Sequence, residues 1–149
     1  MMHEETCPLC RGSRLNKQAL SIYFNDKNIA ELSALNIAET KLFFESYLAD
    51  NKDDIASFIY DTIKPDLNYL LKLRLGHLSI DRRSSTLSDG EAQRLQLAQQ
   101  LSGSLQGITY VLDEPSMGLH QTNINDLLEI IFELKNKGNT IVIVEHNKQ

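Results

Sequence analysis

The stretch from Ile108 to His120, which reads ITYVLDEPSMGLH, constrains the fold more than any other part of this chain. An uninterrupted run of β-type apolar residues ends there in two carboxylates and a proline. This pattern predicts a buried parallel strand whose carboxyl end presents charge at the edge where α/β sheets hold ligands. We therefore expect a phosphate-and-metal site at this edge. The hydrophobic-Asp-Glu pattern taken alone is explained equally well by a strand end followed by an acidic turn.

The two adjacent acids suit different tasks in such a site. Asp113 is expected to hold Mg²⁺, directly or through water. Glu114 is expected to orient or deprotonate the water that attacks a γ-phosphate. Because neighbouring side chains of an extended chain point to opposite sides, the two acids can serve two roles.

Two further stretches flank this strand. Upstream, Leu87 to Arg94 reads LSDGEAQR, a small polar loop that opens a helix. Downstream, a second apolar strand ends in His146, within the run GNTIVIVEH. Together they resemble the ABC-type ATPases, with LSDGE as the signature loop, YVLDE as the Walker B strand, SMGLH as the D-loop and His146 as the switch histidine. The wording LSxGEAQR and YVLDEPSxGLH resembles more narrowly the UvrA family, the damage-recognition subunit of bacterial excinuclease.

The resemblance implies an α/β fold, a partial ABC-type ATPase domain with a parallel-strand lobe and a helical signature subdomain. We place a helical region with a Cys-x-x-Cys turn at residues 1–84. Residues 85–149 are expected to form the signature, Walker B, D-loop and switch-His lobe, with parallel strands at about 108–113 and 140–145.

In ABC-type dimers the signature loop reaches the γ-phosphate of a nucleotide held by the other half. Ser88, Gly90 and the helix start at Glu91 match that role, because N–H groups and the helix dipole attract anions. Asp89 departs from the family, which usually has glycine there, and its carboxylate should repel a triphosphate. Taken alone, Leu-Ser-x-Gly-Glu is better explained as an ordinary N-cap with an acidic first turn.

A long amphipathic helix from about Gln121 to Lys135 is predicted between the two strands. The β-α-β order implies a right-handed crossover and parallel strands that end at one edge. That arrangement would bring His146 near Glu114, where a neutral imidazole can hydrogen-bond the γ-phosphate or its water. A single histidine after a strand is otherwise usually a surface residue. His120 is expected to be structural or interfacial.

Cys7 and Cys10 stand in the spacing Cys-Pro-Leu-Cys, followed by Arg-Gly. Two thiolates at this spacing can bind one metal, and the glycine permits a turn that directs backbone amides at the sulfurs. Tetrahedral zinc needs two more ligands, of which His3 could supply one. A redox pair or two reduced thiols in a loop are the alternatives. The family resemblance favours Zn²⁺.

The region between these motifs is expected to be helical after a short strand at Leu20 to Phe24. Asn36 has the pattern of an N-cap with Glu39 three residues on, and Pro65 is expected to break or kink a later helix from about Asp54 to Arg74. Helical spacing favours core packing over base stacking for the aromatic side chains. The residues concerned are Phe43, Phe44, Tyr47, Phe58 and Tyr60, and the predicted apolar stripe of the later helix is Ile55, Phe58, Ile59, Ile63, Leu67, Leu70, Leu71 and Leu75.

Charge and hydropathy argue against two classes of function, independent nucleic-acid binding and membrane insertion. The net charge of −5 makes the chain a poor nucleic-acid binder by itself, so a DNA contact would need a local patch such as Arg74, Arg82 and Arg83. No apolar run approaches the roughly 20 residues that span a bilayer, and no signal-peptide pattern opens the chain. We expect no membrane partner and a cytoplasmic location.

No G-x-x-x-x-G-K-[ST] motif occurs in the sequence. Without its amides and lysine, the chain alone is not expected to be a competent ATPase. We interpret it as one piece of a UvrA-like ATPase that uses ATP and Mg²⁺ to gate DNA-damage recognition in nucleotide excision repair. The implied partners are a second ABC half or a homodimer partner, damaged DNA through the full-length protein, and a UvrB-like protein. A UvrA-like paralogue in drug resistance and a degenerate, non-catalytic interaction module are the alternatives.

Overall fold

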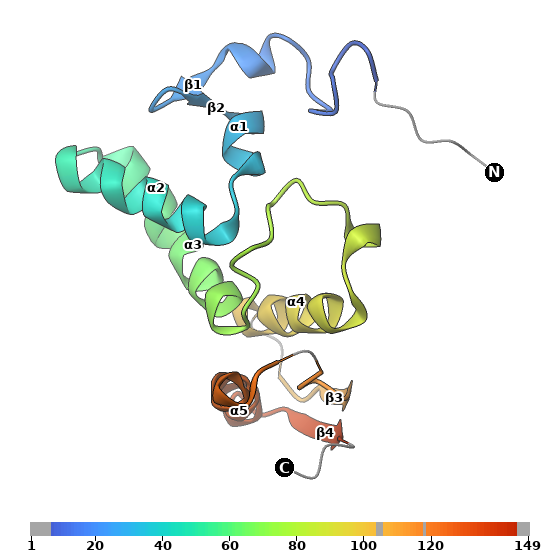
Figure 1. Cartoon of the computed structure of the whole chain (residues 1–149). Coiled ribbons are helices and arrows are strands. Elements are labelled where there is room, and N and C mark those ends of the chain that lie inside the picture. Colours follow the sequence, from blue (N-terminus) through green and yellow to red (C-terminus); the bar gives the residue numbers. More distant parts are fainter. Residues whose placement is uncertain (1–6, 104–105, 118, 146–149) are drawn as a thin grey trace.

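The computed structural model describes residues 7–103, 106–117 and 119–145. The first half holds a 3-10 turn, a small hairpin and three helices, in the upper part of Figure 1. These elements are η1 (Ala19–Ser21), β1 (Tyr23–Phe24), β2 (Lys27–Asn28), α1 (Ile29–Ala34), α2 (Ile37–Asp50) and α3 (Asp54–Lys72). The second half consists of η2 (Ser84–Thr86), α4 (Asp89–Ser102), β3 (Thr109–Asp113), α5 (Gln121–Asn136) and β4 (Thr140–Val144).

Local capping determines where α2 begins. The Asn36 side chain accepts from the Glu39 N–H at 2.8 Å, and the Glu39 carboxylate accepts from the Asn36 N–H at 2.9 Å. This reciprocal pair satisfies two amide groups that the helix itself cannot bond, so the predicted N-cap is confirmed. The strand predicted from Leu20 to Phe24 is wrong in extent. Only Tyr23–Phe24 is a strand, because Asn25 and Asp26 turn the chain with φ of +44° and +60°.

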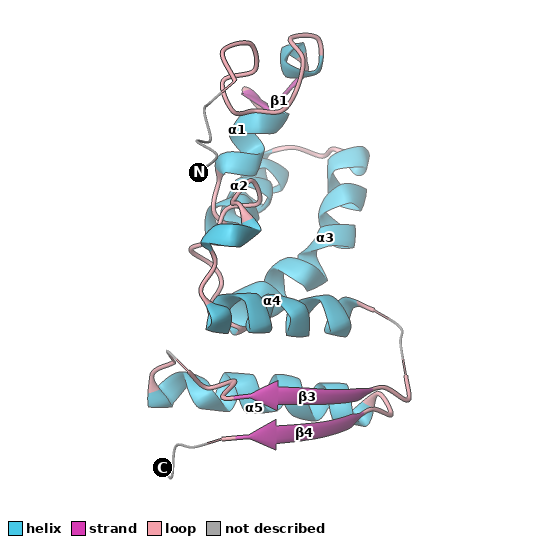
Figure 2. Cartoon of the chain, turned by 90° about the vertical axis from the view of Figure 1, so that its right-hand side faces the viewer, coloured by secondary structure: helices cyan, strands magenta, loops and turns pink. Residues whose placement is uncertain are grey.

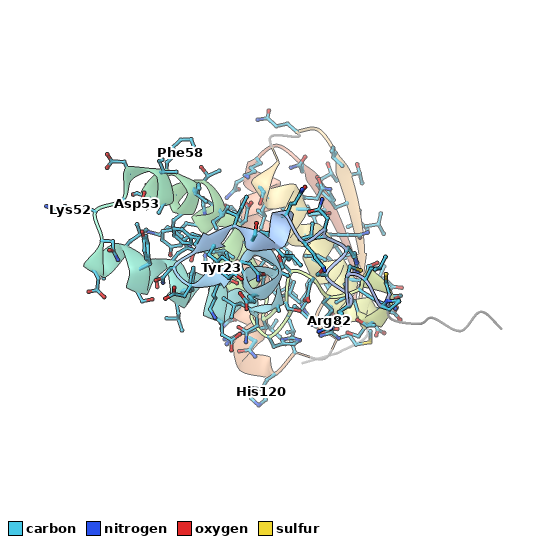
Figure 3. The ribbon with its side chains drawn as sticks, turned by 90° about the horizontal axis from the view of Figure 1, so that it is seen from above. Tyr23, Lys52, Asp53, Phe58, Arg82 and His120 are labelled. Atoms are coloured by element: carbon cyan, nitrogen blue, oxygen red, sulfur yellow. The ribbon has the colours of Figure 1, made fainter. Side chains whose placement is uncertain are left out.

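Helix α3 corrects two expectations. The expected break at Pro65 does not occur, since α3 runs from Asp54 to Lys72, and Tyr60 and Leu67 pack into the core on either side of the proline. The amino-terminal part of the predicted apolar stripe is also wrong, because Ile55 and Phe58 are each 74% exposed. Phe58 lies at the outer margin of the molecule in Figure 3. The face that contacts α2 is offset from the predicted stripe and places Ala56 and Tyr60 inside.

An aromatic cluster joins the hairpin to these helices. The Phe24 ring lies 4.7 Å from Tyr47 and 5.8 Å from Phe44, between centroids, and Phe44 stacks on Tyr60 at 5.7 Å. Phe43 contacts the same group at 5.9 Å from Phe24. Core packing is therefore confirmed for the predicted aromatics other than Phe58, and no base-stacking surface is needed to explain them.

Strands β3 and β4 form the predicted parallel pair. The register runs from Thr109 opposite Thr140 to Asp113 opposite Val144. Helix α5 connects the strands and packs on one face of the pair, as Figure 2 shows. Gly138, with φ of +89°, allows the turn from α5 into β4.

The main core lies between α4, α5 and this face of the strands. Its buried residues are Leu73, Leu75, Leu78, Leu97, Ala98, Leu101, Leu112, Leu127, Ile130, Ile131 and Leu134. Because these come from both sides of residue 84, one core joins the two predicted regions. The boundary between residues 84 and 85 stays a prediction.

The other face of the strand pair is open. Val111 is 68% exposed and Val142 is 45% exposed, so the prediction of a fully buried strand is wrong for this face. Parallel sheets are normally covered on both faces, and here only the α5 side is covered by described residues. None of the helices in the described part of the chain is long and apolar enough to cross a membrane.

Candidate nucleotide and metal site

The carboxyl end of β3 positions the two predicted acids. Asp113 is the last residue of the strand and is exposed. Glu114 leaves the extended conformation, with φ of +45°, and its N–H donates to the Val144 carbonyl at 2.8 Å. The assumption that both acids lie on an extended chain is therefore wrong. Glu114 is instead a left-handed residue at the strand end, a conformation that costs energy for non-glycine residues and persists only where contacts enforce it.

The second strand reaches the same edge. Val144 pairs with Asp113, so Glu145 follows β4 at the edge where Glu114 follows β3. His146 lies outside the described residues, and its approach to Glu114 stays a prediction. His120 is exposed just before α5, and Figure 3 places it at the rim of the molecule.

The predicted signature loop forms the start of α4. Ser88 is the N-cap, and Asp89 and Gly90 form the first turn with Glu91. The Ser88 hydroxyl accepts from the Glu91 N–H at 3.3 Å and lies 3.2 Å from the Glu91 carboxylate. Ser88 and Asp89 are exposed, whereas Gly90 is buried. The arrangement fits a nucleotide-facing helix start and equally an ordinary capping box, so the nucleotide roles of these four residues stay predictions.

Glu91 is held by several groups. Its carboxylate accepts from the Ser88 N–H at 2.9 Å and lies 2.7 Å from His77 Nε2 and 3.8 Å from the Arg82 guanidinium. Two hydrogen bonds mainly lower the pKa of Glu91 to about 2. The larger effect comes from the Ser88 amide, and the next from the bond with His77. Glu91 therefore stays ionised and caps the helix.

We expect Glu91→Gln to flatten the acid dependence of stability. The folded-state pKa of about 2 lies below the ordinary value of 4.5, so ionised Glu91 stabilises the fold above about pH 4.5. That contribution is lost as pH falls from about 4.5 to 2. Urea unfolding at a series of pH values measures it, with the exposed Glu129→Gln as the matched control. An unchanged acid slope in Glu91→Gln would contradict the assignment.

Arg94 is a residue that the sequence interpretation missed. It is 6% exposed, and its guanidinium donates to the Met117 carbonyl at 3.2 Å, which joins α4 to the loop after β3. Beside it lies a pocket of about 430 Å³, lined among others by Arg74, His77, Ser88 and Met117. The sequence signal was an arginine one helical turn after Gly90, on the face of α4 that also holds Leu97 and Leu101.

The predicted basic patch is largely engaged with carboxylates. Arg74 lies 3.0 Å from Asp126, and Arg82 lies 3.8 Å from Glu91. These pairings reduce the positive charge available to phosphates. The patch as a DNA contact stays a prediction.

Cys7 and Cys10 lie in a tight turn. The Arg11 N–H donates to the Cys7 carbonyl at 2.8 Å, and Gly12 has φ of +92°. The Cys10 amide, followed by that of Leu9, lowers the pKa of the Cys7 thiol, as expected for a turn that directs amides at sulfur. Among the residues that the structure describes, no group of three or more His, Cys, Asp or Glu side chains could hold a metal. Two thiols do not complete a tetrahedral zinc site, so the described residues do not fit Zn²⁺ by themselves.

A parallel strand that ends in Asp-Glu beneath a capped Leu-Ser-x-Gly-Glu helix, with a second strand at the same edge, defines a segment of an ABC-type ATPase. UvrABC system protein A from Lactococcus lactis is 45% identical over 148 residues, and the protein of the same name from Bacillus subtilis is 38% identical over 148 residues. Each match covers 99% of this chain and 16% of the relative. No protein-family model matches the chain.

A solved structure agrees with these relatives. The crystal structure of UvrA2 from Deinococcus radiodurans superposes with a TM-score of 0.83 at 40% identity, over 95% of this chain and 19% of that one. The chain belongs to the UvrA family of ABC-type ATPases. It spans less than a fifth of the length of the relatives named here.

Proposed function

We propose that this chain supplies the Walker B acids of one ATP site, and the signature loop that contacts the nucleotide of a partner half, in a UvrA-like ATPase that acts in nucleotide excision repair. The observation that supports this most is the shared edge of β3 and β4. There Glu114 is bonded through its N–H to Val144, directly after Asp113. Strained, over-determined backbone at a sheet edge is a common feature of functional sites.

Each residue then has a defined task. Asp113, an exposed carboxylate, would hold Mg²⁺ directly or through water, and the ion would supply positive charge that offsets the charge of the phosphates. Glu114 orients the attacking water and accepts its proton. His146, which follows Glu145 in the sequence, hydrogen-bonds the γ-phosphate as its sensor.

The start of α4 binds the nucleotide held by a partner half. The helix dipole favours anions at the start of α4, where the Ser88 hydroxyl and the amides of Asp89 and Gly90 lie. Ser88 and Asp89 are also exposed to solvent. Glu91 keeps this first turn in place through its bonds to Ser88 and His77. Another segment supplies the P-loop, the G-x-x-x-x-G-K-[ST] motif that does not occur in this sequence.

By analogy with the relatives, the complete protein uses this site to gate recognition of damaged DNA and association with a UvrB-like partner, in the cytoplasm. A second ABC half or a second copy completes the site. Zn²⁺ at Cys7 and Cys10 would need further ligands, from His3 or from another segment.

One observation favours a different function, that of a non-catalytic interaction module. The Ser88 hydroxyl and the Glu91 N–H already bond each other, and Asp89 adds a carboxylate where the family usually has glycine. If the capping box stays closed, these surfaces serve association only.

A nucleotide titration distinguishes the two functions. A fluorescent ATP analogue with Mg²⁺ is added to the 149-residue chain alone, and then to the chain mixed with the P-loop segment of the Lactococcus relative. We expect tighter binding in the mixture than with either part alone. A mixture that associates, as shown by sedimentation, but binds no more tightly than the P-loop segment would contradict the proposal. Asp89→Gly then tests whether the added carboxylate is the cause.

A further inference from the structure

Arg94 is buried at the junction between α4 and the loop after β3. Its side chain reaches the Met117 carbonyl at 3.2 Å, and its Nε has no hydrogen-bond partner among the residues that the structure describes. Burial lowers the pKa of Arg94, and the negative charge of Glu91 opposes that effect. Placing a guanidinium here is costly, so an apolar side chain would fill the space with less penalty.

Gly90 shows how closely the two segments approach. A Cβ atom at Gly90 would lie 3.2 Å from the Met117 carbonyl oxygen and 3.2 Å from Arg94 Nη1. The absence of a side chain at Gly90 therefore permits the close approach of α4 to the Met117 carbonyl, and the Arg94 side chain bonds that carbonyl. Met117 in turn donates its N–H to the Glu114 carbonyl at 2.9 Å. A short chain of contacts thus runs from the first turn of α4 to Glu114.

The chain direction explains why these parts meet. Helix α4 ends on the side where β3 begins, and β3 runs back beneath it, so the start of α4 lies above the carboxyl end of β3 (Figure 2). The Tyr110 hydroxyl, which donates to Gln100 Oε1 at 2.9 Å, and the core shared by Leu97, Leu101 and Leu112 also hold α4 on β3. Arg94 acts at the other end of this contact, where α4 begins and β3 ends. A planar guanidinium with fixed donor directions is suited to hold a backbone carbonyl in one position.

We propose that Arg94 is a positioning residue that ties the loop from Glu114 to Met117 to the first turn of α4. Its function is to hold the water-activating Glu114 and the nucleotide-binding Ser88 and Gly90 in one arrangement. This role rests on the proposed ATPase function. The tie itself is a property of the chain and can be measured without turnover.

The test compares Arg94→Met, Arg94→Lys and the control Lys72→Met. Lys72 is a cation that lies 3.9 Å from Glu129, and it does not line the pocket beside Ser88. Hydrogen exchange is followed at the Met117 and Leu119 amides, with the amides of Leu97 to Leu101 as an internal reference for the stability of α4. Turnover and nucleotide affinity are measured in the mixture with the P-loop segment.

We expect Arg94→Met to speed exchange at Met117 and Leu119 more than in the reference amides. We also expect it to lower turnover roughly tenfold or more while nucleotide affinity changes little, because misplacement of catalytic groups mainly affects the chemical step. Arg94→Lys, which keeps the charge and one donor, should restore part of both effects. Lys72→Met should resemble the unsubstituted chain.

Equal exchange at Met117 in Arg94→Met and in the unsubstituted chain would overturn the tie. The tie would also be overturned if Arg94→Met sped hydrogen exchange equally at Met117 and in the reference amides of α4. The same holds if exchange at Met117 is as fast in Arg94→Lys as in Arg94→Met. Faster loop exchange with unchanged turnover would overturn the positioning role. If the unsubstituted mixture shows no turnover, the ATPase proposal fails, and the exchange data still decide whether Arg94 ties the loop to α4.

Discussion

Glu114→Gln is expected to lower ATP turnover roughly 10²-fold or more in the mixture with the P-loop segment. Glutamine keeps the size of the side chain and the N–H bond to Val144, but it cannot accept a proton from water. Nucleotide should then bind and remain unhydrolysed. Single-turnover measurement of phosphate release, together with the affinity for a labelled ATP analogue, separates loss of chemistry from loss of binding.

The chain offers a matched control in Glu145. It follows β4 as Glu114 follows β3 and is exposed. Glu145→Gln removes the same charge from the same edge of the sheet. If both variants lower turnover equally, the effect is a general one of charge, and Glu114 is not the base.

Leu134→Ala is expected to destabilise the chain by about 3 kcal/mol, within the range of large-to-small core substitutions. Leu134 is completely buried in the core that joins α4, α5 and β3. Removing its side chain leaves a cavity that rigid helices on either side cannot fill. Urea unfolding of the 149-residue chain measures the change in the free energy of unfolding.

Phe132→Ala is the control on the same helix. Phe132 is larger than Leu134 but is 57% exposed, so its loss should cost less than about 1 kcal/mol. Equal costs for the two substitutions would mean that the core is not centred on this face of α5.

Several elements were predictable because their causes are local. The capping box at Asn36 and Glu39 depends on residues three apart in the sequence, and so does the box at Ser88 and Glu91. The two parallel strands were predicted within a residue of their observed ends, because apolar runs bounded by polar residues have a characteristic length. The family was also correctly identified from short motifs.

Other features were predicted wrongly or missed because distant residues decide them. The sequence of α3 offers two apolar faces, and packing against α2 selects the one with Tyr60 and leaves Phe58 outside. Pro65 was expected to break or kink the helix, yet α3 continues through it, and residues on both sides of the proline pack into the core. The contact between the Glu91 carboxylate and His77, which lies 14 residues earlier in the chain, was missed, and the nucleotide role of Glu91 stays a prediction.

The sequence by itself determined the order of the elements, the starts of the helices and the edge where Asp113 and Glu114 emerge. Those features depend on short-range hydrogen bonding and on the alternation of polar and apolar residues. Only the tertiary structure decided which face of α3 is buried, that Glu114 adopts a left-handed conformation bonded to Val144, and that Arg94 reaches Met117. Each of these depends on contacts between segments that only folding brings together, and no local pattern specifies them.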